Sequence, residues 1–241
     1  MYKPVVLLIS LFIFSAVDGQ NKFDILVFTG TTGFYHKSNP DAQQAVIALG
    51  KKNNFVVDTS TDPAVFLQEK LDKYKVIVFL STGGEDLLNP MQEKSFEEYI
   101  ANGGNFVGIH GASATEYNWE WYGKLVGTFF DNHPKIQQGV INVINKDHPS
   151  TKHLPDQWVW TDEWYNWRKP LPDGYTVLAT VDESTYEGGE MGDFHPIIWC
   201  HQTRDSRSWY TALGHKSEHY SDDNFLQHIL GGILWAAGIE N

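Results

Sequence analysis

The sequence contains only one cysteine, Cys200, among its 241 residues. A chain with one thiol forms no internal disulfide, so a packed core must stabilise it. Cys200 lies in the apolar run IIWC, which favours a small buried side chain over a reactive nucleophile. The sequence also lacks HExxH and CxxC motifs, the standard spacings of metal ligands. We therefore expect no bound metal and no other cofactor.

Basic residues are scarce, with 18 Lys and Arg against 30 Asp and Glu, for a formal net charge of −12. Such an acidic surface repels phosphates, which argues against a nucleic-acid partner. Internal repeats, low-complexity stretches and Pro/Gly/Ser-rich linkers are absent as well. A chain of this length buries about 70% of its unfolded surface in a single core. We therefore predict one domain over residues 20–241.

Long apolar runs are absent except at the start of the chain, MYKPVVLLISLFIFSAVDGQ. Lys3 precedes an apolar stretch over residues 5–16, and small residues lie before Gln20, a pattern typical of a secretory signal. The stretch is short for a membrane span. We predict a signal peptide over residues 1–19, cleavage near Gln20, a periplasmic or secreted protein and no stable membrane insertion. An uncleaved N-terminal anchor is the alternative.

Apolar runs that end in glycine or polar residues alternate with helical patterns over the first half of the chain. Four such runs indicate parallel strands joined by helices, which is a doubly wound sheet. Expected strands lie at 23–30, 55–60, 75–84 and 105–110, and expected helices at 39–53, 64–74 and 89–104. Further strands, some of them antiparallel, are expected at 134–144, 157–165, 175–181, 195–203 and 208–215, before a closing helix at 223–238.

Histidines and carboxylates follow the carboxyl ends of several expected strands. In open α/β sheets these ends face one crevice, where ligands bind. Each residue also has a purely structural explanation, such as a histidine that bonds a loop carbonyl or a carboxylate that caps a turn. The number of strand ends involved favours a functional site. The candidates are His36, Glu85, His110, Asp162, Glu163 and His215.

Aromatic residues make up 14% of the chain and are concentrated in residues 117–167. Most of them are expected in the core. Trp164 and Tyr165, however, follow Asp162 and Glu163 directly, and aromatic rings beside carboxylates are typical of sugar-binding sites, because rings stack on sugar C–H faces. We predict that these two rings help to bind a sugar.

Seven stretches together resemble the ThuA-like family, the trehalose-utilisation proteins, over residues 24–238. They are LVFTGTTGFYHKS, VFLSTGGEDL, YIANGGNFVGIHGAS, GTFFDNHP, DEWYNW, SWYTALGH and ILWAAG. The resemblance implies a class I glutamine amidotransferase-like fold: α/β, three-layer α/β/α, doubly wound and flavodoxin-like, with a mostly parallel sheet. It also implies a role in sugar metabolism, with trehalose, related disaccharides and keto-sugars as substrates.

His110 stands where amidotransferases of this fold carry their nucleophilic cysteine, so we expect no glutaminase activity. Ser113 is a weak substitute nucleophile, because no G-x-S-x-G motif surrounds it. A histidine at this turn suits general acid–base catalysis instead.

We therefore predict an exported carbohydrate hydrolase or lyase that acts on a disaccharide, glycoside or keto-sugar. His110 is the expected acid or base, and Glu163 or Asp162 its partner. The expected substrate-binding residues are His36, Glu85, His133, Trp164, Tyr165 and His215.

Two alternatives stay open: a non-catalytic sugar-binding module, and a metal-dependent hydrolase in which His110, His133 and Glu163 meet. The expected partner is a small sugar, and assembly into a homo-oligomer is left open.

Overall fold

The protein is described here by a computed structural model that covers residues 23–239. The predicted signal peptide and cleavage point lie outside these residues. Within the described part of the chain, no helix is long and apolar enough to cross a membrane.

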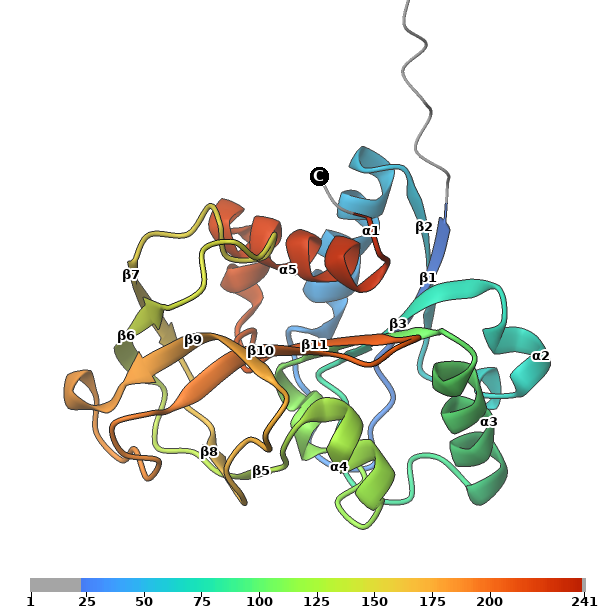
Figure 1. Cartoon of the computed structure of the whole chain (residues 1–241), viewed down its shortest axis with the longest axis horizontal. Coiled ribbons are helices and arrows are strands. Elements are labelled where there is room, and N and C mark those ends of the chain that lie inside the picture. Colours follow the sequence, from blue (N-terminus) through green and yellow to red (C-terminus); the bar gives the residue numbers. More distant parts are fainter. Residues whose placement is uncertain (1–22, 240–241) are drawn as a thin grey trace, which may run out of the picture.

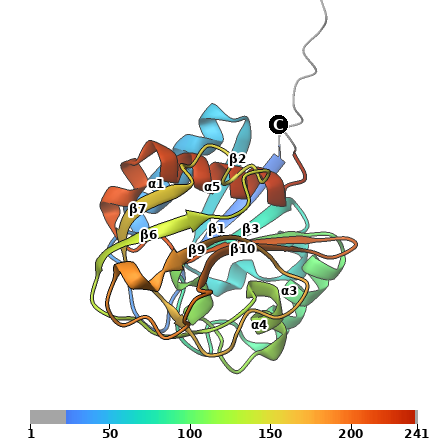
Figure 2. The ribbon, with the colours of Figure 1, turned by 60° about the vertical axis from the view of Figure 1, so that its left-hand side comes forward.

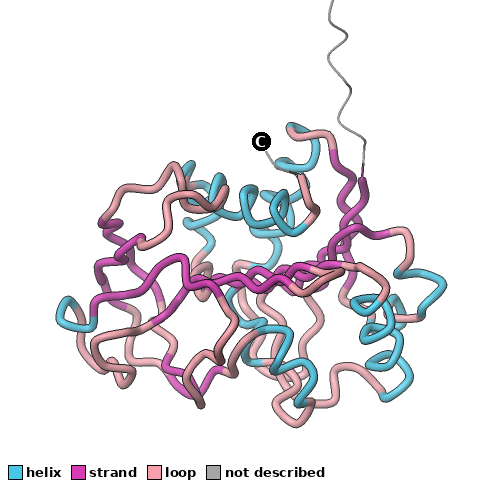
Figure 3. Tube along the Cα trace, viewed as in Figure 1, coloured by secondary structure: helices cyan, strands magenta, loops and turns pink. Residues whose placement is uncertain are grey.

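A nine-stranded sheet forms the middle layer, in the order β2-β1-β3-β4-β11-β10-β9-β6-β7 (Figures 1 and 3). Its strands are β1 (Phe23–Phe28), β2 (Phe55–Ser60), β3 (Tyr74–Leu80), β4 (Asn105–Ile109), β6 (Gln137–Val143), β7 (Gln157–Asp162), β9 (Thr176–Asp182), β10 (Pro196–Gln202) and β11 (Arg207–Thr211). A separate two-stranded ribbon joins β5 (Phe130–Asn132) to β8 (Asn166–Trp167). The predicted strands are all present, and most of them end a few residues earlier than expected.

Helices cover both faces of the sheet, so the fold is a three-layer α/β/α structure, as predicted. Helices α1 (Asn39–Lys52) and α5 (Asp223–Ala236) lie on one face, and α3 (Pro90–Ala101) and α4 (Glu120–Val126) on the other (Figures 1 and 2). The start of α3 shows how the sequence sets a boundary. The Asn89 side chain accepts hydrogen bonds from the Met91 and Gln92 amides, and Pro90 occupies the first helical position.

The helix expected over residues 64–74 is wrong in its extent. Only a 3₁₀ turn, Pro63–Val65, and the four-residue α2 (Gln68–Leu71) form there. Tyr74 already belongs to β3 and pairs with Asp24 of β1. The backbone of Phe66 and Leu67 is not helical and interrupts the expected helix, and the sheet takes the last residue of the segment.

The strand directions bring distant segments to one edge of the sheet. β1, β2, β3, β4 and β11 are mutually parallel, whereas β10, β9, β6 and β7 pair antiparallel in succession. From β11 to β7 the direction reverses four times, so β7 runs the same way as β4. The carboxyl ends of β1, β3, β4, β11 and β7 therefore lie at the same edge, as sequence reasoning required.

Candidate functional site

His110 follows the last residue of β4 and opens a short 3₁₀ helix, His110–Ala114. Its φ of 52° is in the left-handed region, which is unfavourable for a residue with a Cβ and recurs at functional turns. The Tyr210 hydroxyl donates to the His110 carbonyl at 2.8 Å and so fixes the turn. Gly111 follows because a Cβ there would lie 2.6 Å from the Thr82 carbonyl oxygen.

The His110 ring is completely buried, and both of its nitrogens have neighbours. Nδ1 lies 2.8 Å from the Ala212 carbonyl oxygen, and since a carbonyl only accepts, Nδ1 must carry the proton. Nε2 in the neutral ring is therefore an acceptor. It lies 2.8 Å from the Tyr165 hydroxyl, which donates to it. The backbone thus selects one tautomer and aims the Nε2 lone pair into the site.

Glu163 is the centre of the cluster, because three imidazoles surround its carboxylate. Oε2 is 3.5 Å from Nε2 of His110 and 3.1 Å from Nδ1 of His215. Oε1 is 3.5 Å from Nε2 of His133. The Glu163 side chain is 9% exposed, whereas those of His215 and His133 are 20% and 35% exposed. Solvent therefore reaches the cluster on the side of these two histidines.

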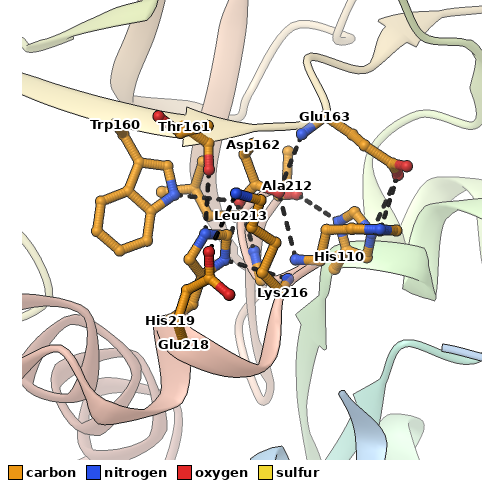
Figure 4. A network of polar contacts seen from close by, with 12 residues as sticks. His110, Trp160, Thr161, Asp162, Glu163, Ala212, Leu213, Lys216, Glu218 and His219 are labelled. Carbon is orange, nitrogen blue, oxygen red and sulfur yellow. Dashed lines mark hydrogen bonds and ion pairs between the residues drawn. The ribbon is translucent and has the colours of Figure 1, made fainter. Parts of the chain in front are cut away.

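Asp162 points away from the cluster and holds the backbone around it (Figure 4). Its carboxylate accepts hydrogen bonds from the backbone amides of Gly214 at 2.9 Å, Glu163 at 3.0 Å and His215 at 3.3 Å. The Trp160 indole donates to it at 3.1 Å. With its oxygens occupied in this way, Asp162 is a positioning residue for Glu163 and His215.

His36 comes from the loop after β1 and is 6% exposed. Its ring centroid is 4.8 Å from that of His110 and 5.5 Å from that of His215. Its Nδ1 is buried and has no hydrogen-bond partner. A buried ring nitrogen without a partner is costly and therefore needs an explanation.

The buried carboxylate and its neighbours shift each other's proton affinities. Burial alone raises the pKa of Glu163, but the adjacent imidazoles of His110 and His215 outweigh burial, and the pKa falls well below its usual range. The hydrogen bond to Glu163 raises the pKa of His215. Burial lowers the pKa of His36 to about 3, helped by the nearby His110 and His215. Glu163 is therefore an anion and His36 a neutral imidazole.

The structure brings His36, His110, His133, Glu163, Tyr165 and His215 together, but not every candidate. Trp164 is 1% exposed, and its indole donates to the Gln137 carbonyl, so it forms no sugar-binding wall. Glu85 contacts Thr32 through its backbone carbonyl and makes no contact with Glu163 or the histidines. Ser113 is fully buried against the Tyr210 hydroxyl, out of reach as a nucleophile. Cys200 is buried and free, as predicted.

Sequence reasoning missed a histidine–carboxylate pair, His195 and Glu183, that supports Tyr165. The ring of His195 is buried, and its Nε2 donates to the Tyr165 carbonyl at 2.8 Å. On the other side of the ring, Nδ1 lies 2.8 Å from Oε1 of Glu183 and 2.9 Å from the Tyr186 hydroxyl. No sequence motif marks this pair, because the two residues are 12 positions apart, Glu183 in a 3₁₀ helix and His195 just before β10.

It also missed the exposed aromatic residues beside the site. Phe34 and Tyr35 are 68% and 56% exposed, and the Phe34 ring packs edge-on against His36 at 4.9 Å. Their position next to a candidate histidine in GFYHKS was an available indication.

A hollow of about 380 Å³ lined by Tyr117 and Arg168, among others, contains none of the cluster's side chains.

Four side chains of the cluster are also arranged as metal ligands. One ligand atom from each of His36, His110, Glu163 and His215 lies within 4.8 Å of the others. Chemically, the site offers a buried carboxylate, a fixed imidazole acceptor and two imidazoles that solvent reaches.

Comparisons with known proteins agree with this architecture. The model of the family described as "ThuA: Trehalose utilisation" matches residues 24–236. A ThuA-like protein from Bacteroides uniformis is 28% identical, with a TM-score of 0.73 over 89% of this chain and 91% of that one. A ThuA-like protein from Parabacteroides merdae is 20% identical, with a TM-score of 0.72 over 90% of each chain.

A GMP synthase protein from Thermoplasma acidophilum is 13% identical, with a TM-score of 0.55 over 91% of this chain and 96% of that one. This likeness shows the amidotransferase-like fold alone. None of the curated proteins compared with the chain is significantly similar.

Proposed function

The chain belongs to the ThuA family of trehalose utilisation, and we propose from that premise that it is an enzyme which processes a disaccharide, glycoside or keto-sugar at the Glu163 cluster. The reaction is a hydrolysis or an elimination, driven by proton transfer between imidazoles, Glu163 and the sugar. Glutaminase chemistry is not proposed, since His110 replaces the nucleophilic cysteine of this fold.

One observation carries the proposal: a single buried carboxylate lies 3.1–3.5 Å from the ring nitrogens of three histidines. Groups that share protons over such distances suit general acid–base catalysis. His133 supports this role. Its Nδ1 donates to the Pro134 carbonyl at 2.7 Å, so its Nε2 attracts Glu163 only when it also carries a proton. These contacts support the proposal that His133 is the proton donor on the exposed side.

Phe34 and Tyr35 are proposed to bind the sugar. They are the exposed rings next to His36, and aromatic faces stack on the C–H faces of sugars. This assignment replaces Trp164, whose ring is buried.

The test is a screen of the purified protein against disaccharides and their 3-keto forms, with products identified by mass. Glu163→Gln and His133→Asn should each lower kcat by about 10²–10⁴-fold, the usual contribution of general acid–base groups. His201→Asn is the matched control, because this partly exposed histidine on β10 lies outside the cluster and should keep full activity.

The same screen separates an enzyme from a non-catalytic sugar-binding module. A binding module would gain thermal stability from a sugar, yet neither wild type nor variant would turn it over. A protein that neither turns over nor is stabilised by any of these sugars would contradict the proposal altogether.

We also propose that the protein is exported, because its first 19 residues have the composition of a signal peptide. Intact mass of the protein recovered from its natural host should show a start near Gln20. A mature chain that begins at Met1 would contradict export by cleavage.

A further inference from the structure

We infer that His36, His110, Glu163 and His215 bind one divalent first-row transition-metal ion, with Zn²⁺ the ion that these donors fit best. The inference rests on the same cluster as the proposed function and assigns that enzyme a cofactor. From the sequence, a metal site was only an open alternative, with His133 in the ligand set, because the four residues are more than 50 positions apart and form no motif.

The spacing of three ligand atoms carries the inference. His110 Nε2, His215 Nδ1 and Glu163 Oε2 form a triangle with sides of 3.1, 3.3 and 3.5 Å. Around Zn²⁺, with bonds of about 2.0–2.1 Å, tetrahedral ligands lie about 3.3 Å apart. The three atoms therefore already stand at the separations that one ion requires, without a change in the backbone.

The partners of His110 have the pattern that metal-bound histidines show. Its Nδ1 donates to the Ala212 carbonyl, which fixes the ring and leaves Nε2 unprotonated. A ligating histidine almost always donates its other N–H to such an oxygen. The backbones of His215 and Glu163 are fixed as well, because their amides donate to the Asp162 carboxylate.

His36 supplies independent support and the fourth ligand. Its ring is buried and its Nδ1 has no hydrogen-bond partner, and one of its two ring nitrogens belongs to the cluster of four potential ligand atoms. Because the four ligand atoms fit within 4.8 Å, the His36 ring would move inward by at most about 1.5 Å to complete a tetrahedron. Binding to an ion would thus give this buried imidazole a partner inside the cluster.

The donor set decides which ions fit. Three imidazoles and one carboxylate suit Zn²⁺ and neighbouring transition metals. Mg²⁺ and Ca²⁺ prefer oxygen ligands and fit poorly. The Tyr165 hydroxyl, which donates to His110 Nε2, must give up this hydrogen bond when the ion binds. A sugar oxygen would have to join as a fifth ligand to be polarised by the ion, and His133, outside the ligand set, would keep its role in proton transfer.

The experiment measures metal binding apart from activity. The protein is purified without a histidine tag, stripped with a chelator, loaded with Zn²⁺ and passed through a desalting column. Elemental analysis gives the stoichiometry, and competition with a chromophoric chelator gives the Kd. Co²⁺ substitution adds a visible absorption spectrum that reports nitrogen ligands and low coordination number.

We expect one Zn²⁺ per wild-type chain and a higher melting temperature on loading. Loss of a supporting residue usually costs 10–100-fold in affinity, so loss of a ligand in Glu163→Gln or His215→Asn should raise the Kd by at least about 100-fold. His36→Asn should raise it by about 10–100-fold, because His36 is the most distant ligand. The His201→Asn control should bind like wild type. Circular dichroism of the stripped proteins verifies that each variant is folded.

Two results would overturn the inference: a wild-type chain that retains well under one ion, or folded Glu163→Gln and His215→Asn variants with wild-type affinity. This failure is distinguishable from failure of the proposed function. A protein that binds one Zn²⁺ but turns over no sugar keeps the site and loses the activity. A protein whose sugar turnover survives chelation unchanged keeps the activity and loses the metal.

Discussion

Replacement of Asp162 by asparagine should destabilise the protein more than its conservative shape suggests. Asp162 is completely buried, and its two oxygens accept from four donors. Oδ2 faces the Trp160 indole and the Gly214 amide, and Oδ1 faces the Glu163 and His215 amides. Whichever oxygen becomes an NH₂ group, two donors lose their acceptor and face another donor, and an NH₂ group in place of Oδ2 gains only a long contact with Nδ1 of His219 at 3.4 Å.

The magnitude follows from those two lost bonds. Hydrogen bonds to a charged group contribute about 1.5–3 kcal/mol each, so Asp162→Asn should lower the free energy of unfolding by about 3 kcal/mol or more. In a chain of this size that corresponds to a fall in Tm of about 6–12 °C. Asp131→Asn is the control, because this exposed carboxylate lies 3.9 Å from Arg168 Nε and should contribute under about 0.5 kcal/mol.

The assay is urea denaturation of both variants at pH 8, followed by tryptophan fluorescence and circular dichroism. A loss below about 1 kcal/mol in Asp162→Asn, the size of one ordinary hydrogen bond, would refute the reasoning. It would mean that this carboxylate does not hold the strand end from which Glu163 projects.

Three further outcomes are expected. Gly111→Ala should cost about 1–3 kcal/mol, measured by urea denaturation, because its Cβ would lie 2.6 Å from the Thr82 carbonyl oxygen; a neutral result would contradict this close approach. Burial lowers the pKa of His228 to about 3, so between about pH 6.5 and 4 only the unfolded state takes up a proton at this residue. The free energy of unfolding should therefore fall by about 1.4 kcal/mol per pH unit from this group as the pH drops through that range. In His228→Asn, the slope of the free energy of unfolding against pH should lose the contribution of one proton. Burial raises the pKa of Cys200 to about 12, so a thiol reagent should label it in denaturant and not in the native protein, where rapid labelling would show an accessible thiol.

Much of the fold was predictable because it follows from local patterns. Apolar runs such as 23–28 and 74–80 are buried on both faces, and this makes parallel strands recognisable. The end of the segment at 64–74 was not predictable, because pairing of Tyr74 with β1 overrides an amphipathic pattern. Helical and strand preferences compete locally, but the neighbouring strand decides between them.

The sequence predicted which residues form the candidate site better than it predicted what each of them does there. His36, His110, Glu163 and His215 follow apolar runs, so their convergence at one edge could be inferred. Trp164 could not be placed, because successive side chains at the end of a strand point to different sides, and its ring turns into the core.

The sequence by itself determined the α/β class, the exclusion of a cysteine nucleophile and the strand ends that carry histidines and carboxylates. These properties depend on residue type and short-range periodicity. Only the tertiary structure decided that Asp162 binds backbone amides while Glu163 meets three imidazoles, and that the ligand atoms of His110, His215 and Glu163 stand 3.1–3.5 Å apart. Asp162 and Glu163 are adjacent carboxylates with the same local chemistry. Their roles differ because the fold brings backbone amides to Asp162 and imidazole rings to Glu163.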